Sequence, residues 1–248
     1  MENKLFFILY YLKNYPTFDV LGYKFDLDRS KACTNVHKLT PILQTALREL
    51  GVLPKRKFSS ANEMAEAFKN VEDLFIDATE RLHFRHKDYE KQKENYSGKQ
   101  KGHTVKNTVI ADACKTVLFL GYTVSGSMHD YGLLKNEFPQ AENWFENFNL
   151  WIDLGYLGIQ SDYESISINI PDKKPRKSKS NPFPCLTKEQ KEKNKNISKV
   201  RVVVENAIGG MKRFNILTTK FRNKITGFVD DVAILAAGLW NLKLSMKK

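Results

Sequence analysis

The stretch VEDLFIDATE, residues 71 to 80, marks the point where the sequence changes from helical spacing to short strands. Its apolar run ends in Asp77, which predicts a strand that carries this carboxylate at its end. Four later runs have the alternating or β-branched pattern of strands: HTVKNTVIADA (103–113), TVLFLGYTVSG (116–126), NLWIDLGYLGI (149–159) and ESISINIP (164–171). The fourth of the five predicted strands would end at Asp153.

Helices are predicted around these strands in a definite order. One helix is expected at about 129–138, between the third and fourth strands, and the long stretch KVRVVVENAIGGMKRF at 199–214 follows the fifth. The apolar run 232–244 predicts a packed terminal helix. Three strands, a helix, two strands and a long helix are the order of an RNase H-like mixed α/β sheet, although several other mixed sheets share it.

The residues before the first strand predict an all-α module. Helices are expected at 3–14, at 17–25 and from 28 or 30 onward, because Tyr15-Pro16 ends the first and Thr17, Asp28 or Ser30 can cap the others. We expect Thr40-Pro41 to start a further helix, which Gly51 closes.

Residues 51–60 have the composition of a linker, and Ser60 can cap a helix through Asn70. The chain is therefore expected to divide into a helix-turn-helix module at 1–58 and an RNase H-like catalytic domain at 59–248.

The third predicted helix has two distinct faces. Cys33, Val36 and Leu39 would form its buried stripe, while another face carries three polar side chains: Lys31, Asn35 and Lys38. This pattern resembles a helix-turn-helix whose second helix enters the DNA major groove. The alternative is a small helical bundle with a solvated basic face.

Composition favours a nucleic-acid partner. The 248 residues contain 40 Lys and Arg against 28 Asp and Glu, a net charge of +12, which suits a polyanion. Three dispersed cysteines without a C-x-x-C pair argue against a disulfide framework or a cysteine zinc site, and favour a reducing cytoplasmic location. The apolar runs are too short to cross a bilayer, so no membrane partner is expected.

Three carboxylates form the candidate site: Asp77 and Asp153 at strand ends and Glu205 in the long helix. Arg201, Glu205 and Lys212 fall on one face of that helix, opposite an apolar stripe. Such carboxylates suit Mg²⁺, and paired ions catalyse phosphodiester chemistry. Taken singly, each acid would more commonly be a turn residue or a helical ion-pair partner.

Further basic groups are candidates for contact with DNA phosphates. Arg201 and Lys212 flank Glu205. A second basic cluster is formed by Lys99, Lys101, His103 and Lys106, of which the first three would alternate onto one face of a strand. Residues 173–199 hold ten Lys or Arg against two Glu. We predict a mobile basic insertion that binds phosphates; the alternative is a plain solvated loop.

Several motifs resemble the insertion-sequence-5 family of bacterial transposases, relatives of the Harbinger-type DDE superfamily endonucleases. They are IDATER (76–81), YSGKQKGHTVKN (96–107), GSMHD (126–130), IDLGYLGI (152–159), RVVVENAIGGMKRF (201–214) and the closing FVDDVAILAAGLWNLKL (228–244). The resemblance covers essentially the whole chain and implies an RNase H-like fold.

The resemblance also implies a catalytic and metal-binding triad of two aspartates and a glutamate, which match Asp77, Asp153 and Glu205. Arg201 and Lys212 fit the spacing of the family's glutamate region, whereas Ser198 stands where relatives have a tyrosine. Asp130 is the rival for the second aspartate. Because it precedes a helix, its commonest role would be an N-cap or a glycine-loop contact, and strand order favours Asp153.

By this resemblance the protein would be a DNA transposase. It would bind the terminal inverted repeats of its element, cleave strands with Mg²⁺, for which Mn²⁺ would substitute, and transfer the freed 3′-hydroxyls into target double-stranded DNA. Work at two ends implies a homodimer or larger active complex. Relatives often have a further stretch before the first helix, which leaves N-terminal truncation open. The alternatives are an RNase H-like nuclease without strand transfer, or an inactive or truncated relative that only binds DNA.

Overall fold

The first quarter of the chain forms three packed helices: α1 (Glu2–Asn14), α2 (Phe18–Phe25) and α3 (Arg29–Glu49). The structure is a computed structural model that describes residues 2–179 and 181–247. Both predicted caps are present, because the Thr17 hydroxyl accepts a hydrogen bond from Val20 N and the Asp28 carboxylate accepts one from Lys31 N. Met1, Ser180 and Lys248 lie outside the described residues.

α3 is a single helix, so the predicted new start at Thr40-Pro41 is wrong. Pro41 lies inside the helix, and the Thr40 hydroxyl donates to the Val36 carbonyl at 2.8 Å instead of capping a new one. The apolar stripe explains this continuity, since it keeps helical spacing across the proline: Ala32, Val36, Thr40, Leu43 and Leu47 are all buried. Gly51, with φ of 68°, ends the helix as predicted.

The predicted linker is hydrogen-bonded to the sheet. It runs beside strand β4 (Val117–Leu120): Lys55 N donates to the Leu118 carbonyl, and Leu120 N donates to the Lys55 carbonyl. Ser60 then caps α4 (Ala61–Ala67), as predicted. The helical region is therefore fastened to the sheet through its connecting segment.

A mixed seven-stranded sheet forms the centre of the remaining chain. Its path is β2–β3–β1–β6–β7, with β4 and β5 both paired to β3. β1 runs antiparallel to β3 but parallel to β6, and β6 runs parallel to β7. The strands other than β4 are β1 (Asp73–Leu82), β2 (Tyr96–Ser97), β3 (Gly102–Ala111), β5 (Val124–Ser125), β6 (Asn149–Trp151) and β7 (Ser167–Asn169).

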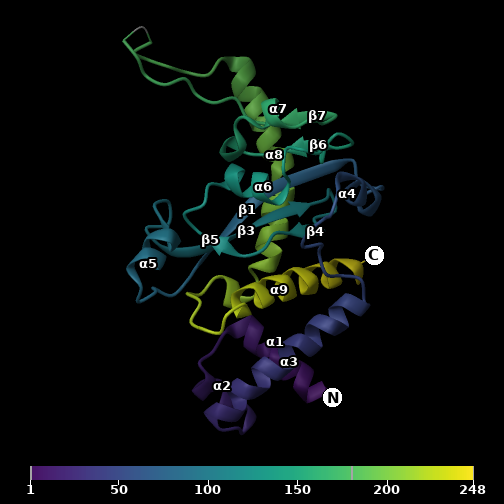
Figure 1. The fold of residues 1–248 in the computed structure, drawn as a ribbon, viewed down its shortest axis with the longest axis vertical. Helices are drawn as coiled ribbons and strands as arrows, with labels where there is room; N and C mark the ends of the chain where they lie inside the picture. Colours follow the sequence, from purple (N-terminus) through teal and green to yellow (C-terminus); the bar gives the residue numbers. More distant parts are fainter. Residues whose placement is uncertain (1, 180, 248) are drawn as a thin grey trace.

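Helices cover both faces of the sheet, as in an RNase H-like domain (Figure 1). One core packs α8, α9 and the N-terminal helices against one face, and the other packs α4, α6 and α7 against the opposite face. The remaining helical elements are α5 (Tyr89–Asn95), α6 (Asp130–Glu137), the 3-10 turns η1 (Leu154–Tyr156) and η2 (Asn215–Leu217), α7 (Ile159–Asp162), α8 (Lys188–Met211) and α9 (Phe228–Ser245).

Several elements differ from their predicted form: the strand predicted at 116–126 is divided into β4 and β5, and α5, β2 and α7 are absent from the prediction. Asp77 lies in the middle of β1 rather than at its end, because β1 continues to Leu82 alongside β3. The basic stretch 173–199 is not wholly a loop: α8 begins at Lys188, with a capping box between Thr187 and Gln190. Figure 1 shows this half of α8 and the preceding loop extending away from the sheet.

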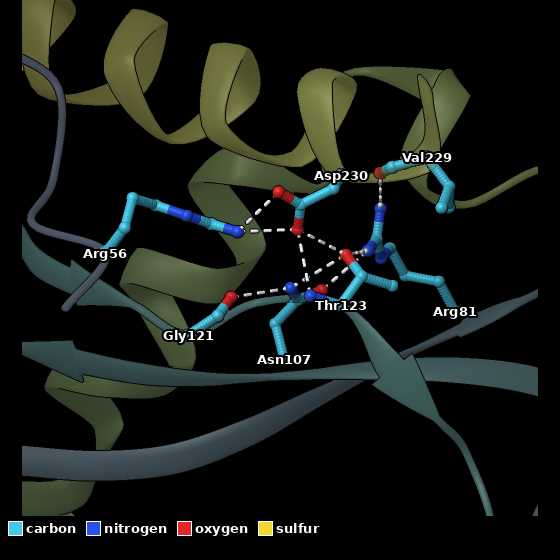
Figure 2. A network of polar contacts seen from close by, with 7 residues as sticks. All are labelled: Arg56, Arg81, Asn107, Gly121, Thr123, Val229 and Asp230. Carbon is cyan, nitrogen blue, oxygen red and sulfur yellow. Dashed lines mark hydrogen bonds and ion pairs between the residues drawn. The ribbon is translucent and has the colours of Figure 1, made fainter. Parts of the chain in front are cut away.

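A buried polar network joins the linker, the sheet and α9 (Figure 2). Arg56 donates to both carboxylate oxygens of Asp230, and Oδ1 of Asp230 also accepts from the backbone N–H and hydroxyl of Thr123. Arg81 on β1 donates to Asn107, Thr123 and the Val229 carbonyl.

Within the described residues, no helix combines the length and apolar character needed to span a membrane.

Candidate active site

Two of the predicted acids follow the point where the parallel strands β1 and β6 stop pairing. The ladder between β1 and β6 ends two residues before Asp77 on one strand and two residues before Asp153 on the other. Backbone amides hold both carboxylates: Asp77 Oδ1 accepts from Ala78 N at 2.8 Å, and Asp153 Oδ1 accepts from Gly155 N at 2.7 Å. Ligand sites of α/β sheets form where the carboxyl ends of parallel strands meet.

The pKa of Asp77 is affected by two other carboxylates that lie close to it. Burial, together with the negative charges of Asp153 and Asp130, raises the pKa of Asp77 from 3.8 to about 6. Two groups lower the pKa of Asp77: the Ala78 N–H and the Arg201 guanidinium. Arg201 Nη2 lies 3.5 Å from Asp77 Oδ2. A bound cation would stabilise an anion that burial and like charges destabilise in this way.

Asp130 lies at this site but does not cap α6. It is the first helical residue, and its Oδ1 lies 2.7 Å from the Nζ of Lys106, which also donates to the Met128 carbonyl at 2.8 Å. The N-cap position belongs to His129, whose side chain makes no capping hydrogen bond. The predicted N-cap role of Asp130 is therefore wrong, because a buried lysine on β3 pairs with its carboxylate.

Gly155 and Tyr156 lie next to these acids. A Cβ on Gly155 would come within 2.8 Å of Asp153 Oδ1 and 3.4 Å of Asp130 Oδ2, so both carboxylates lie against its backbone. Tyr156 is fully buried, and burial and the surrounding carboxylates raise the pKa of its hydroxyl well above the ordinary value. Among the described residues this hydroxyl has no hydrogen-bond partner, so it is an available donor.

Glu205 lies on the exposed side of α8. α8 buries Val204 against the sheet, and since successive helical residues are about 100° apart, Glu205 falls at the exposed margin of the helix. The described residues contain no group of three or more His, Cys, Asp or Glu side chains arranged to hold a metal ion. Asp77, Asp153 and Asp130 thus lie within electrostatic reach of one another, and the place of Glu205 in the site stays a prediction.

The basic side chains beside Glu205 are directed to β1. The Arg201 side chain is 12% exposed and pairs with Asp77. The Nζ of Lys212 donates to the Glu80 carbonyl at 3.3 Å, and burial lowers the pKa of this lysine. Arg201 and Lys212 thus both reach β1 from α8. Their shared face with Glu205 and their contact with DNA phosphates stay predictions.

The second basic cluster lies in a turn rather than on one strand. β3 begins only at Gly102, so Lys99 and Lys101 belong to the turn that links it to β2, and Lys101 has a φ of 49°. The predicted alternation with His103 is therefore wrong, because the turn interrupts the strand. Both lysines are exposed and His103 is half-buried.

The polar face of α3 is accessible. Lys31 and Lys38 are exposed and Asn35 is half-buried, and Lys31 forms an ion pair with Asp28 at 3.3 Å. Asn35 and Lys38 also line a hollow of about 330 Å³ between α1 and α3. The face is thus free for a partner.

Sequence reasoning missed Lys106 and Tyr156 as parts of this site. The sequence places Lys106 in a basic cluster, but its side chain is buried and neutralises Asp130. A polar residue within the apolar run of β3 was the available signal, since a lysine there requires a partner. Nothing in the local sequence distinguishes Tyr156 from an ordinary core tyrosine.

Comparison with known families agrees with this architecture. Residues 76–241 match the family model described as DDE superfamily endonuclease. The chain belongs to this family. Residues 1–49 of this DDE endonuclease match the model described as the helix-turn-helix of DDE superfamily endonuclease, which corresponds to α1, α2 and α3.

A curated relative extends the match over the whole chain. The probable transposase for insertion sequence element IS702 of Microchaete diplosiphon is 30% identical over 250 residues, which cover 100% of this chain and 82% of the relative. No solved structure matches the chain.

The DDE family implies use of a divalent metal, and the aspartate pair fits one. Mg²⁺ typically binds through one or two carboxylates, with waters and substrate phosphates completing the shell. Asp77 and Asp153 supply two hard carboxylates; the pKa of Asp77 stays raised although Arg201 is close, and the buried Tyr156 hydroxyl has no partner among the described residues.

Proposed function

We propose that this DDE endonuclease is a transposase of the insertion-sequence-5 type, which binds the terminal inverted repeats of its element, cleaves DNA strands and transfers the 3′-hydroxyl ends to target DNA. The adjacency of Asp77 and Asp153 at the ends of the β1–β6 pair carries the proposal. The family match and the similarity to a probable transposase support it.

Asp77 and Asp153 would hold Mg²⁺, or Mn²⁺ in its place, and Glu205 would be the third catalytic and metal-binding acid of the family triad. The metal, when bound, would activate the attacking oxygen and stabilise the leaving oxygen of an in-line displacement. The positive charge of Arg201 lowers the pKa of Asp77 and so stabilises its ionised form. The backbone amides of Ala78 and Gly155 orient the two carboxylates.

DNA would be held by basic groups on several elements. The α3 face of Lys31, Asn35 and Lys38 would contact the terminal repeat, in keeping with the helix-turn-helix match. Phosphates nearer the site would meet Arg201 and Lys212 and the turn cluster of Lys99, Lys101 and His103. Because an element has two ends, the active complex would contain at least two copies of the chain.

A second candidate function, DNA binding without chemistry, is favoured by one observation: Glu205 is exposed, and the described residues contain no group of three or more acids arranged to hold a metal ion. A chain of this kind would keep the helical module and the basic surfaces. It would bind the terminal repeat and leave it intact.

The test uses a labelled duplex that carries the element's own terminal repeat, together with a supercoiled target plasmid. Wild type and Glu205→Gln are compared with Mg²⁺, with Mn²⁺ and with chelator. We expect wild type to release 3′-hydroxyl ends and join them to the plasmid only with metal, and Glu205→Gln to bind the duplex equally well without product.

Cleavage without joined ends would replace the transposase by a nuclease. Binding by wild type with neither cleavage nor joining would leave the DNA-binding function alone. Full activity of Glu205→Gln would remove this glutamate from the triad.

A further inference from the structure

Aromatic rings gather beyond the end of β1. Phe84 and His86 lie with ring centroids 4.6 Å apart, and His86 stacks on His83 at 5.6 Å and 23°. Tyr96 meets His103 edge to face at 6.0 Å. His83 N donates to the His103 carbonyl at 2.8 Å and thereby joins the two ring groups.

The ring group is held by a stacked column that reaches the helical module. His83 stacks on Phe221 at 14°, and Phe221 stacks on Tyr15 at 9°, where α1 ends. Tyr15, Phe221 and His83 are each less than 10% exposed, whereas His86 is half-buried and Tyr96 is 48% exposed. The column therefore has a rigid buried base and an accessible outer end.

Cations surround the accessible end. The Nζ of Lys224 lies 6.0 Å from the ring centroid of Phe84. The positive charges of Arg85 and Lys220 lie close enough to His103 to lower its pKa. Burial, followed by these charges, lowers the pKa of His103, and burial lowers the pKa of His83 to about 4, so both rings are neutral near pH 7. The acidic residues between His86 and Tyr96 are Asp88, which caps α5, and Glu90 and Glu94 on that helix.

Neutral rings among cations match the requirements of unpaired nucleic acid. Proteins that bind single strands combine a positively charged surface with aromatic side chains on which bases stack. A duplex offers phosphates to the cations but conceals the faces of its bases, so the rings would gain nothing from fully paired DNA.

The ring group lies within reach of the candidate active site. Asp77 and His83 are six residues apart along an extended chain, which spans roughly 20 Å at 3.3 Å per residue. At about 3.4 Å per nucleotide along one strand, this distance corresponds to about six nucleotides. Lys212 contacts β1 at Glu80, between the two positions.

We propose that the patch formed by Phe84, His86, Tyr96, His103, Lys220 and Lys224 is a stacking site for an unpaired base of the DNA that enters the active site. The proposal rests on the proposed function, because it assumes that the substrate is DNA. It assigns a role in binding, and none in the chemistry of cleavage.

The test measures binding in chelator, so that no chemistry is needed. The probes are a 20-nucleotide single strand that contains one 2-aminopurine and the same strand paired in a duplex. Wild type should quench the fluorescence of the single strand. His86→Ala and Tyr96→Ala should each weaken single-strand binding roughly 5- to 100-fold, the range for loss of one stacked base, and leave duplex binding within about twofold.

Two controls separate stacking from folding and charge. Tyr23→Ala removes a tyrosine that is 92% exposed on α2, outside the patch, and should behave as wild type. His86→Phe keeps a ring without a titratable group and should retain the quenching. Unchanged thermal melting of each variant verifies the fold.

Equal single-strand binding by wild type, His86→Ala and Tyr96→Ala would overturn the proposal, as would equal losses with Tyr23→Ala. The proposed function is scored separately by metal-dependent cleavage. Stacking without cleavage would retain the patch and reject the transposase, whereas cleavage and end joining without stacking would retain the transposase and reject the patch.

Discussion

Asp77 connects the geometry of the site to pH. Its carboxylate must be ionised to hold a cation, and its pKa is raised to about 6 mainly by burial. Metal-dependent cleavage should therefore fall as the pH drops through about 6. Arg201→Gln removes a cation that lowers this pKa, so the acid limb of the pH–rate profile should move to higher pH. The measurement is the initial cleavage rate from pH 5 to 8.

The control for this profile is Lys38→Gln, a loss of one positive charge on α3, which should leave the acid limb in place. An acid limb that stays fixed in Arg201→Gln would show that Asp77 does not set it. The same result would contradict the pairing of Arg201 with Asp77.

Glu137, near the end of α6, makes a separate contribution to stability. Burial raises the pKa of its carboxyl from 4.5 to about 7, which corresponds to roughly 3 kcal/mol of preference for the neutral form. The folded state thus holds a proton that the unfolded state has released, and stability should decline as the pH rises from about 4.5 through 7. Glu137→Gln should remove much of this decline and raise the free energy of unfolding at pH 8, measured in urea.

Equal pH dependence of unfolding in wild type and Glu137→Gln would contradict this ionisation. Glu142→Gln is the matched control. Its carboxylate accepts a hydrogen bond from Ala61 N, so this variant shows the effect on stability of losing a hydrogen-bonded glutamate elsewhere in the same core.

Single residues also show how far sequence reasoning reaches. Asp77 and Asp153 are predictable because acids beside strands are visible in the alternation of the chain. The pairing of Lys106 with Asp130 is not, because it joins residues 24 positions apart on β3 and α6. Local pattern gives the direction of a side chain, but the partner depends on how elements pack.

At the scale of elements, the network of Figure 2 fastens α9 and the linker to the sheet. Asp230 is the acidic member that faces Arg56, and its charge also supports the buried Arg81. Asp230→Ala should lower the free energy of unfolding by about 3–5 kcal/mol, because it leaves buried guanidinium charge uncompensated.

The matched control is Asp231→Ala, which removes the neighbouring half-buried carboxylate. Burial raises the pKa of Asp231, so loss of its charge should cost less than about 1 kcal/mol. Equal losses in the two variants, measured by urea unfolding, would show that the network does not stabilise the fold.

The loop before α8 is a second element with its own prediction. Residues 173–186 hold five Lys or Arg and no Asp or Glu, and Figure 1 shows the loop extending away from the sheet. Replacing it with a Gly/Ser segment of equal length should make the dependence of DNA affinity on salt shallower. The slope of log affinity against log salt concentration should become less steep by about 0.9 for each DNA phosphate that the loop no longer neutralises. An unchanged slope would make it a plain solvated loop.

Errors at this scale have a common physical origin. The sequence predicts a helix start at Pro41, but the buried stripe of α3 outweighs the one hydrogen bond that proline removes. Strong charge predicts a loop at residues 188–199, yet the capping box at Thr187 starts a helix there. Tertiary packing and capping decide both cases against local composition.

At the scale of the whole molecule, the helical module and the sheet share one core through α9. Figure 1 shows α9 between the sheet and α1 and α3, and buried residues from all of these elements pack in the same cluster. The order of the longer strands and helices is predictable from alternation and spacing, whereas the short elements α5, β2, β5 and α7 are not. The position of Glu205 relative to the aspartates is not, because it depends on how α8 is rotated against the sheet.

The most direct test of the aspartate pair is cleavage of a labelled duplex that carries the element's terminal repeat, with Mg²⁺ against chelator. Wild type, Asp153→Asn and Asp130→Asn are compared. We predict metal-dependent 3′-hydroxyl ends from wild type, none from Asp153→Asn although it binds the duplex as tightly, and residual cleavage by Asp130→Asn. Wild-type turnover by Asp153→Asn, with complete loss in Asp130→Asn, would contradict the account and assign the second aspartate to Asp130.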